Sequence, residues 1–311
     1  MSKTKKKNQE SSGSFKHFAQ RVSVMLLEAI ALLPFWFLYL LSDVLYMFVK
    51  GVFRYRSKVI ITNLKYAFPE KSEQEILVLR NKFYRYFCDV SLESIKLRRL
   101  SAKQLHKRVK FSGTEQLEAM AQKHNGAILL AFHYNNWEWS SALQQQLNCK
   151  LLMVYNKMRD NKTMDNFLQK AREKWGGEAV SMRRAPKESF RYFTKNEPAV
   201  LGLIADQSAL ASSPMWAMFL NREAAFFQGP VKIAGKTNQP VFFQEAIRLA
   251  RGKYEYRYSL LVEDPGQTGD KEILLRYISK MEEVIKSNPE YYLWSHKRWK
   301  HKRPEGTALI Q

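Results

Sequence analysis

Three short apolar runs in the middle of the chain constrain its fold more than any other feature. They cover residues 127–132, 151–154 and 199–205, and helical patterns follow them near residues 137–147, 163–175 and 186–194. Strands that alternate with helices are typical of an α/β layer with a parallel sheet. Further strands are expected at residues 241–247 and 254–262, and a last helix at about 271–287. We therefore predict an α/β fold whose central, largely parallel sheet is flanked by helices.

Polar residues follow each of these three runs. His133 comes after the first, Tyr155-Asn156 after the second and Asp206-Gln207 after the third. Open α/β sheets bind ligands at the carboxyl ends of their strands. The sequence therefore predicts that these side chains line one crevice.

His133 opens the hexapeptide His-Tyr-Asn-Asn-Trp-Glu, which ends at Glu138. A neutral imidazole can take the proton of a hydroxyl group, and a carboxylate can fix its tautomer and stabilise the imidazolium that forms. On a regular helix this spacing would place the side chains roughly 140° apart, so a turn must separate a strand end from a helix start. Asn135-Asn136 suits that turn, because asparagine tolerates left-handed backbone angles. We expect His133 to be a general base that Glu138 orients; the alternative is a core histidine beside a surface glutamate.

The N-terminal region predicts membrane attachment. Residues 1–14 are polar and lysine-rich, and we expect them to form a disordered basic tail. Residues 22–49 are almost entirely apolar, with an expected kink at Pro34 and basic residues on both sides. This stretch is too long for a signal peptide, and a buried core helix is the main alternative. We assign residues 15–56 to a membrane-anchoring helical segment and 57–311 to the domain that follows; whether the segment spans the bilayer or lies in its interface stays open.

The formal charge of +22, from 51 basic and 29 acidic residues, favours negatively charged partners. Nucleic acid, anionic lipid and an acidic protein all fit this charge. Residues 297–303 interleave aromatic and basic side chains, which suits a membrane surface or an acidic carrier protein, and no recognised nucleic-acid motif accompanies them. Cys88 and Cys149 supply neither a disulfide framework nor metal-ligand spacing, so no metal is expected.

The hexapeptide at His133 resembles the His-x4-Asp/Glu signature of glycerolipid-type acyltransferases. Its Asn-Trp-Glu ending resembles the branch that contains the late, or secondary, acyltransferases of lipid A biosynthesis. An ordered set of segments of this kind is much more specific than the hexapeptide alone, and the resemblance covers the chain from about Val22. The other matching segments are Asn63-Leu64 with Phe68-Pro69-Glu70, Asp206-Gln207, Phe226-Phe227 with Gly229-Pro230, and residues 289–304.

This resemblance implies a glycerolipid acyltransferase-like domain at residues 57–311 that is bound to the inner membrane and faces the cytoplasm. The implied enzyme moves a fatty acyl chain from acyl–acyl-carrier protein, or acyl-CoA, to a hydroxyl of a lipid A precursor, with His133 and Glu138 as catalytic residues and no cofactor. Its implied partners are acyl carrier protein, an anionic lipid acceptor and the membrane, and not nucleic acid. Candidate substrate-binding residues are Asn136, which can also simply shape the turn, Arg159, Arg184, Asp206 and Gln207.

Two positions depart from the family pattern. The family usually has glycine where this chain has Asn135, and we expect the turn to survive because asparagine adopts similar backbone angles. The family usually has Tyr-Arg-Pro where this chain has Tyr155-Asn156-Lys157, which leaves a lysophospholipid, an aminolipid or a pigment open as the acceptor. A non-enzymatic basic protein at a membrane surface or on nucleic acid is a third alternative, against which the intact His133–Glu138 pair argues.

Overall fold

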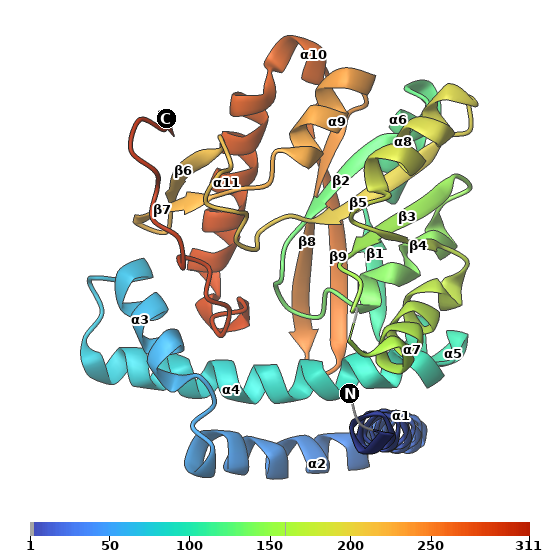
Figure 1. Cartoon of the computed structure of the whole chain (residues 1–311). Helices are drawn as coiled ribbons and strands as arrows, with labels where there is room; N and C mark the ends of the chain where they lie inside the picture. Colours follow the sequence, from blue (N-terminus) through green and yellow to red (C-terminus); the bar gives the residue numbers. More distant parts are fainter. Residues whose placement is uncertain (1–2, 159) are drawn as a thin grey trace.

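A seven-stranded sheet forms the centre of the computed structural model, which describes residues 3–158 and 160–311 and the side chains from Phe18 onward (Figure 1). The strand order is β1-β9-β8-β2-β5-β3-β4, and neighbouring strands are parallel except for β8 and β9. The predicted α/β fold with a largely parallel sheet is confirmed. The strands are β1 (Val109–Ser112), β2 (Ala127–Ala131), β3 (Lys150–Tyr155), β4 (Glu178–Ser181), β5 (Ala199–Ile204), β8 (Val241–Ala250) and β9 (Lys253–Val262).

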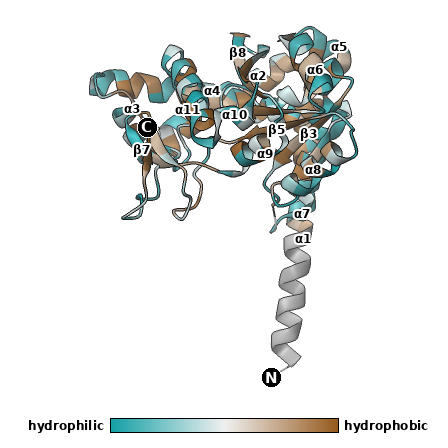
Figure 2. Cartoon of the chain, turned by 90° about the horizontal axis from the view of Figure 1, so that it is seen from above, coloured by the Kyte–Doolittle hydropathy of each residue, from teal (hydrophilic) through white to brown (hydrophobic). Residues whose placement is uncertain are grey.

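Two hydrophobic cores cover the two faces of this sheet. Successive strand residues point to opposite faces, so Leu130 of β2 packs in one core and Leu129 in the other. The first core includes side chains of α9 (Gly229–Thr237) and α11 (Asp270–Ser287), and the second includes side chains of α6 (Thr114–Lys123) and the 3₁₀ helix η3 (Trp139–Gln146). Figure 2 shows the hydrophobic segments along the central strands. Burial on both faces explains why the strands read as continuous apolar runs.

The N-terminal region forms helices that lie beside the sheet domain. Pro34 separates α1 (Lys3–Leu32) from α2 (Phe35–Met47), which confirms the expected break, and a π-helical turn η1 (Phe48–Val52) follows. In Figure 1, α2 runs alongside α4 (Glu73–Lys96), the long helix beneath the sheet. The stretch Phe35–Val52 is apolar and long enough to cross a membrane by length and composition. The division of the chain at residues 14 and 56 stays a prediction.

Shorter elements complete the part of the chain that the structure describes. A small sheet of order β10-β6-β7 packs on the side of α11, and the segment after α11 returns to the end of β2, where Tyr292 forms an isolated β-bridge with Tyr134. These elements are α3 (Ser57–Ala67), η2 (Leu97–Arg99), α5 (Ala102–His106), α7 (Lys162–Arg172), η4 (Glu173–Trp175), α8 (Ala185–Thr194), β6 (Trp216–Phe219), β7 (Arg222–Ala225), α10 (Pro265–Thr268), η5 (Pro289–Tyr291) and β10 (Leu309–Ile310).

Candidate active site

Three parallel strands end side by side at the carboxyl edge of the sheet. Strand β5 lies between β2 and β3 and pairs with both. The residues that follow these strands therefore meet, as the sequence predicted, around a cavity of about 440 Å³. Its polar lining includes His133, Glu138, Tyr155, Asn156 and Gln207.

A tightly held turn carries His133 into this cavity. Asn135 has a φ of +50°, so the left-handed conformation expected of this asparagine is confirmed. Its side-chain amide donates to the carbonyl of Ala246 at 2.6 Å, and its own carbonyl accepts a hydrogen bond from the Tyr86 hydroxyl at 2.9 Å. The His133 carbonyl accepts from the backbone N–H of Leu293 at 3.1 Å. Contacts from β8, α4 and the C-terminal segment therefore fix the backbone at the histidine.

Both nitrogens of the His133 ring have side-chain partners. Nδ1 lies 2.7 Å from Oδ1 of Asp206, and Nε2 lies 3.1 Å from the amide nitrogen of Gln207. Because the Gln207 amide nitrogen can only donate, Nε2 must accept, and Nδ1 carries the proton that is donated to Asp206. This tautomer presents a basic Nε2 lone pair toward the cavity, which is the arrangement that a general base requires.

Asp206 is a buried carboxylate that accepts a hydrogen bond from His133. Its side chain is 3% exposed, and that of His133 is 15% exposed. Burial by itself would raise the pKa of Asp206, but the charge and hydrogen bond of His133 lower this pKa below its ordinary value. An ionised carboxylate on Nδ1 fixes the orientation and the tautomer of the ring.

Glu138 is not the residue that orients His133. Its two carboxylate oxygens accept hydrogen bonds from Nε and Nη2 of Arg172 at 2.9 and 2.8 Å, and both ring nitrogens of His133 are bound to Asp206 and Gln207 instead. The prediction that Glu138 orients His133 is therefore wrong, because Asp206 holds Nδ1 of the ring. Burial would raise the pKa of Glu138, and the charges of Arg172 and His133 lower it below its ordinary value. Arg172 thus holds Glu138 beside the cavity as a buried carboxylate.

A second cavity, of about 570 Å³, meets the first at His133. His133, Trp137, Glu138, Leu168 and Gln207 line both. The first cavity is lined by residues of β2, β3 and β5 and of the helices around them, mainly with aliphatic side chains, whereas the second lies between α4, α7, the C-terminal segment and Leu27 of α1. Two separate spaces therefore open onto one basic nitrogen.

Comparison with known proteins places this geometry in a family. Residues 6–301 match the family described as bacterial lipid A biosynthesis acyltransferase. The chain belongs to this family. It is also 24% identical over 238 residues to a "Lipid A biosynthesis acyltransferase" of Haemophilus influenzae, an alignment that covers 75% of this chain and 72% of that protein. The protein is therefore an acyltransferase of lipid A synthesis, and the resemblance of its motifs to that family is confirmed.

The substrate-binding candidates of this acyltransferase fall in different places. Gln207 lines both cavities, and Asp206 lies behind His133. Asn136 is fully buried and donates to Glu93 rather than facing a cavity, because its side chain caps the turn. Arg184 pairs with Glu188 at the surface, where its side chain is 68% exposed. Arg159 lies outside the described residues.

Two residues of the acyltransferase site had no distinguishing signal in the sequence. Arg172 is one of several arginines near the expected cavity mouth, and only the fold pairs it with Glu138. The sequence around His296 lacks the strand-end setting of His133 and predicts a solvated side chain, but His296 lines the second cavity, and burial lowers its pKa to about 4. This expectation was wrong because the C-terminal segment folds back onto the end of β2.

Proposed function

We propose that the protein is a membrane-bound O-acyltransferase that transfers a fatty acyl chain from acyl–acyl-carrier protein to a hydroxyl group of a lipid A precursor. The observation that carries this proposal is the hydrogen-bonded series Asp206–His133–Gln207 at the point where two cavities meet. A general base at the junction of two compartments suits a direct transfer between two bound lipids, with no acyl-enzyme intermediate.

His133 supplies the proton transfer in the proposed reaction. The acceptor hydroxyl takes the place of Gln207 on Nε2, and its oxygen attacks the thioester carbonyl carbon as Nε2 takes the proton. The tetrahedral intermediate then loses its carbon–sulfur bond, and the imidazolium returns the proton to the departing thiolate. Asp206 keeps the ring in the correct tautomer and stabilises the imidazolium through both steps.

Gln207 and Glu138 have supporting roles in this mechanism. Once the acceptor hydroxyl occupies Nε2, the Gln207 amide is free to donate to the oxyanion that develops on the thioester oxygen. The Glu138 carboxylate lies close enough for the His133 charge to lower its pKa, so it favours the imidazolium in return. Arg172 holds Glu138 in place with two hydrogen bonds.

The lining of each cavity suggests which substrate it holds. The first cavity has Leu129, Leu143, Leu151 and Met153 along its inner wall, which suits the acyl chain of the donor. The second cavity includes Leu27 and Arg56, which come from the N-terminal apolar region and its basic flank. We assign this second cavity to the lipid acceptor, because it adjoins the helices that contact the membrane.

Exposed apolar side chains identify these membrane-contacting helices. Because α2 runs alongside α4, an α2 that crossed the bilayer would carry the buried acids Asp89 and Glu93 and the exposed Arg85 of α4 into hydrocarbon, at high cost (Figure 1). We therefore place α2 in the plane of the interface, with basic side chains near the head groups. The exposed apolar residues of this region include Phe18, Val22, Met25, Leu26, Leu32, Trp36, Phe37, Leu40, Val44, Met47, Phe48, Val52 and Phe53.

The charge of the protein fits the proposed donor and location. A net charge of +22 attracts an acidic carrier protein and the anionic cytoplasmic leaflet of the inner membrane, so the catalytic domain faces the cytoplasm in this proposal. Acyl-CoA is the alternative donor. A competition assay in which purified protein chooses between the two donors distinguishes them.

Mass spectrometry of lipid A and of total lipids, from cells with and without the gene, tests the proposed function. Loss of one acyl chain from lipid A on deletion, restored by the wild-type gene and not by H133A, is the expected result. If lipid A were unchanged and another acylated lipid were missing, the proposed acceptor would be wrong, and the proposed acyl transfer with His133 as the base would stand. An H133A protein that is folded and fully active would overturn the mechanism.

A further inference from the structure

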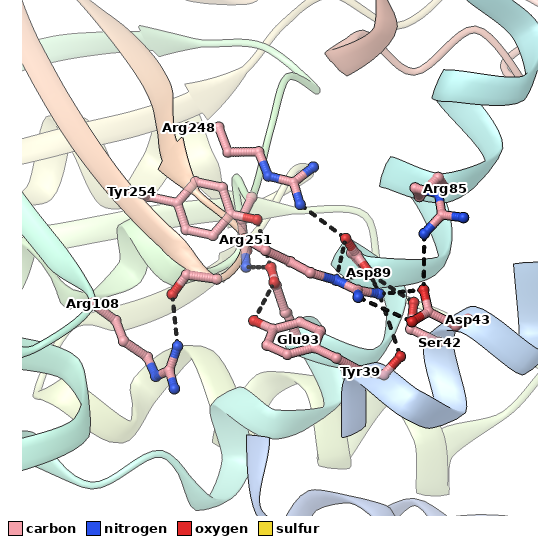
Figure 3. A network of polar contacts seen from close by, with 12 residues as sticks. Tyr39, Ser42, Asp43, Arg85, Asp89, Glu93, Arg108, Arg248, Arg251 and Tyr254 are labelled. Carbon is pink, nitrogen blue, oxygen red and sulfur yellow. Dashed lines mark hydrogen bonds and ion pairs between the residues drawn. The ribbon is translucent and has the colours of Figure 1, made fainter. Parts of the chain in front are cut away.

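A buried polar network joins the anchor helix α2 to the catalytic domain. Figure 3 shows Tyr39, Ser42 and Asp43 of α2 facing two acids of α4, Asp89 and Glu93. Both acids are almost completely buried, at 1% and 0% exposure. Buried carboxylates are costly unless several donors satisfy them, so the number and origin of their donors indicate what the network does.

The two acids have different sets of partners. Asp89 accepts from Ser42 at 2.7 Å, from Arg248 at 2.9 Å and from Arg251, which also pairs with Asp43. These contacts tie α2 and the β8–β9 hairpin to α4, and none of them reaches the turn that follows His133. Asp89 therefore serves the docking of α2.

Glu93 lies four residues further along α4 and contacts the loop that follows His133. Its carboxylate accepts hydrogen bonds from the Tyr39 hydroxyl at 2.8 Å, the Tyr254 hydroxyl at 2.7 Å and the Asn136 amide at 2.8 Å. Its backbone carbonyl accepts from the Trp139 indole at 2.8 Å. Three secondary-structure regions thus converge on one carboxylate: the anchor helix, strand β9 and the turn after His133.

Asn136 connects Glu93 to the active site through hydrogen bonds. While its amide nitrogen binds Glu93, its side-chain oxygen accepts from the backbone N–H of Trp139 at 3.2 Å and so caps the start of η3. The Asn136 carbonyl accepts from the hydroxyl of Tyr256. Asn136 lies between His133 and Glu138, so a shift of this residue displaces both catalytic side chains.

From these contacts we infer that Glu93 is a positioning residue, which sets the geometry of His133 and Glu138 and links it, through Tyr39, to the docked anchor helix. The inference rests on the proposed function for its kinetic consequence. A misplacement of about 1 Å can lower the rate of a reaction about a hundredfold, so the position of this turn matters for catalysis. A carboxylate that only stabilised the fold would lower the melting temperature of its variants without changing kcat per folded molecule.

Four variants of the full-length, membrane-reconstituted protein separate these roles. We expect E93A to lower kcat by roughly ten- to a hundredfold with little change in KM, and Y39F by roughly three- to tenfold. E93Q should recover most of the rate, because its amide oxygen can accept from Asn136 and Tyr254 while the Tyr39 hydroxyl accepts from its amide nitrogen. The matched control is S42A, which removes a buried hydrogen bond of α2 to Asp89 and leaves Glu93 untouched. It should lower the melting temperature without lowering kcat.

A second readout does not depend on acyl transfer. Diethyl pyrocarbonate modifies accessible, unprotonated imidazole nitrogens, and peptide mass spectrometry measures its rate at each histidine. His133 should react several-fold faster in E93A and Y39F than in the wild type or S42A, while the exposed His106 reacts at the same rate in all of them. Equal His133 reactivity in all variants, or equal kcat in E93A and S42A, would overturn the inference. If the wild type showed no acyl transfer while the His133 reactivities still differed among the variants in this way, the proposed function would be wrong and the inference about Glu93 would stand.

Discussion

Nδ1 of His133 lies 2.7 Å from the carboxylate of Asp206, a residue 73 positions away in the sequence. The two side chains follow β2 and β5, which are adjacent and parallel, so the strand pairing itself brings them together. His133 and Asp206 each lie two residues beyond the end of their strand, so the pairing of β2 with β5 sets the distance between them.

Replacing Asp206 tests its role in orienting the base. We expect D206N to lower kcat by about a thousandfold or more, because an amide can donate to Nδ1 and hold the wrong tautomer, as the corresponding change does in serine proteases. Single-turnover acyl transfer per folded molecule measures this effect, with circular dichroism as the control for folding. A decrease of less than tenfold would show that Asp206 is dispensable for orientation.

The Arg172–Glu138 pair predicts a pH-dependent stability. Burial raises and Arg172 lowers the pKa of Glu138, which lies below its ordinary value of 4.5. The pair therefore contributes stability that is present above about pH 4.5 and is lost as the pH falls through the lowered pKa. In R172M the largest lowering influence is gone, and we expect burial, which outweighs the remaining influence of His133, to raise this pKa instead. Its unfolding free energy should then be about 3–5 kcal/mol lower than that of the wild type near pH 7, and this deficit should shrink toward pH 4.5 as Glu138 takes up a proton.

Urea unfolding of both proteins between about pH 4 and pH 7 measures this difference. The double variant E138Q/R172M is the control, because it has no charge left to bury and should show a deficit that does not change with pH. A constant deficit in R172M itself would contradict the prediction.

The backbone angle of Asn135 predicts different effects of glycine and alanine. N135A should lower the free energy of unfolding by about 2–3 kcal/mol, because it loses the hydrogen bond to Ala246 and forces a residue with a Cβ into the left-handed region. N135G loses the same hydrogen bond without the backbone strain, so it should cost about 1 kcal/mol. Thermal unfolding compares the two variants. The prediction fails if alanine is tolerated as well as glycine.

Gly202 of β5 lines the apolar cavity, and its replacement tests the assignment of this cavity to the donor chain. A methyl group there meets Leu152 and Leu151 only at ordinary contact distances of 3.6 and 3.8 Å, so G202A should keep the donor preference of the wild type. The side chain of G202L extends into the cavity and should displace about two methylenes of the longest donor chain. The loss of their burial should lower kcat/KM for that donor about tenfold. Competition between acyl donors of two lengths measures the ratio of their kcat/KM values. If G202L lowered kcat/KM equally for both lengths, this cavity would not hold the donor chain.

The exposed apolar face of α2 predicts how the protein binds membranes. The side chains of Trp36 and Met47 are 70% and 61% exposed, so W36E/M47E should leave stability nearly unchanged and weaken binding to anionic vesicles by tenfold or more. The control is M218E, because Met218 is exposed on β6, a strand that lies far from α2 in Figure 1. Vesicle flotation measures binding. Equal flotation of both variants would contradict the in-plane placement of α2.

Local patterns in the sequence determined much of this protein. The alternation of apolar runs and helices specified a parallel sheet, because strands buried on both faces must be apolar throughout. His133 could be placed at a strand end, and the left-handed turn at Asn135 could be predicted, because both depend on neighbouring residues only. The family resemblance, too, rests on short ordered motifs.

Only the tertiary structure decided which groups surround the base. The sequence pairs His133 with Glu138 because they are near in the chain, but β5 places Asp206 on the ring, and α7 places Arg172 on Glu138. The link from Glu93 to Asn136 likewise joins residues 43 positions apart. Hydrogen bonds act over about 3 Å, so their partners are chosen by the order of strands and the packing of helices, which no local pattern encodes.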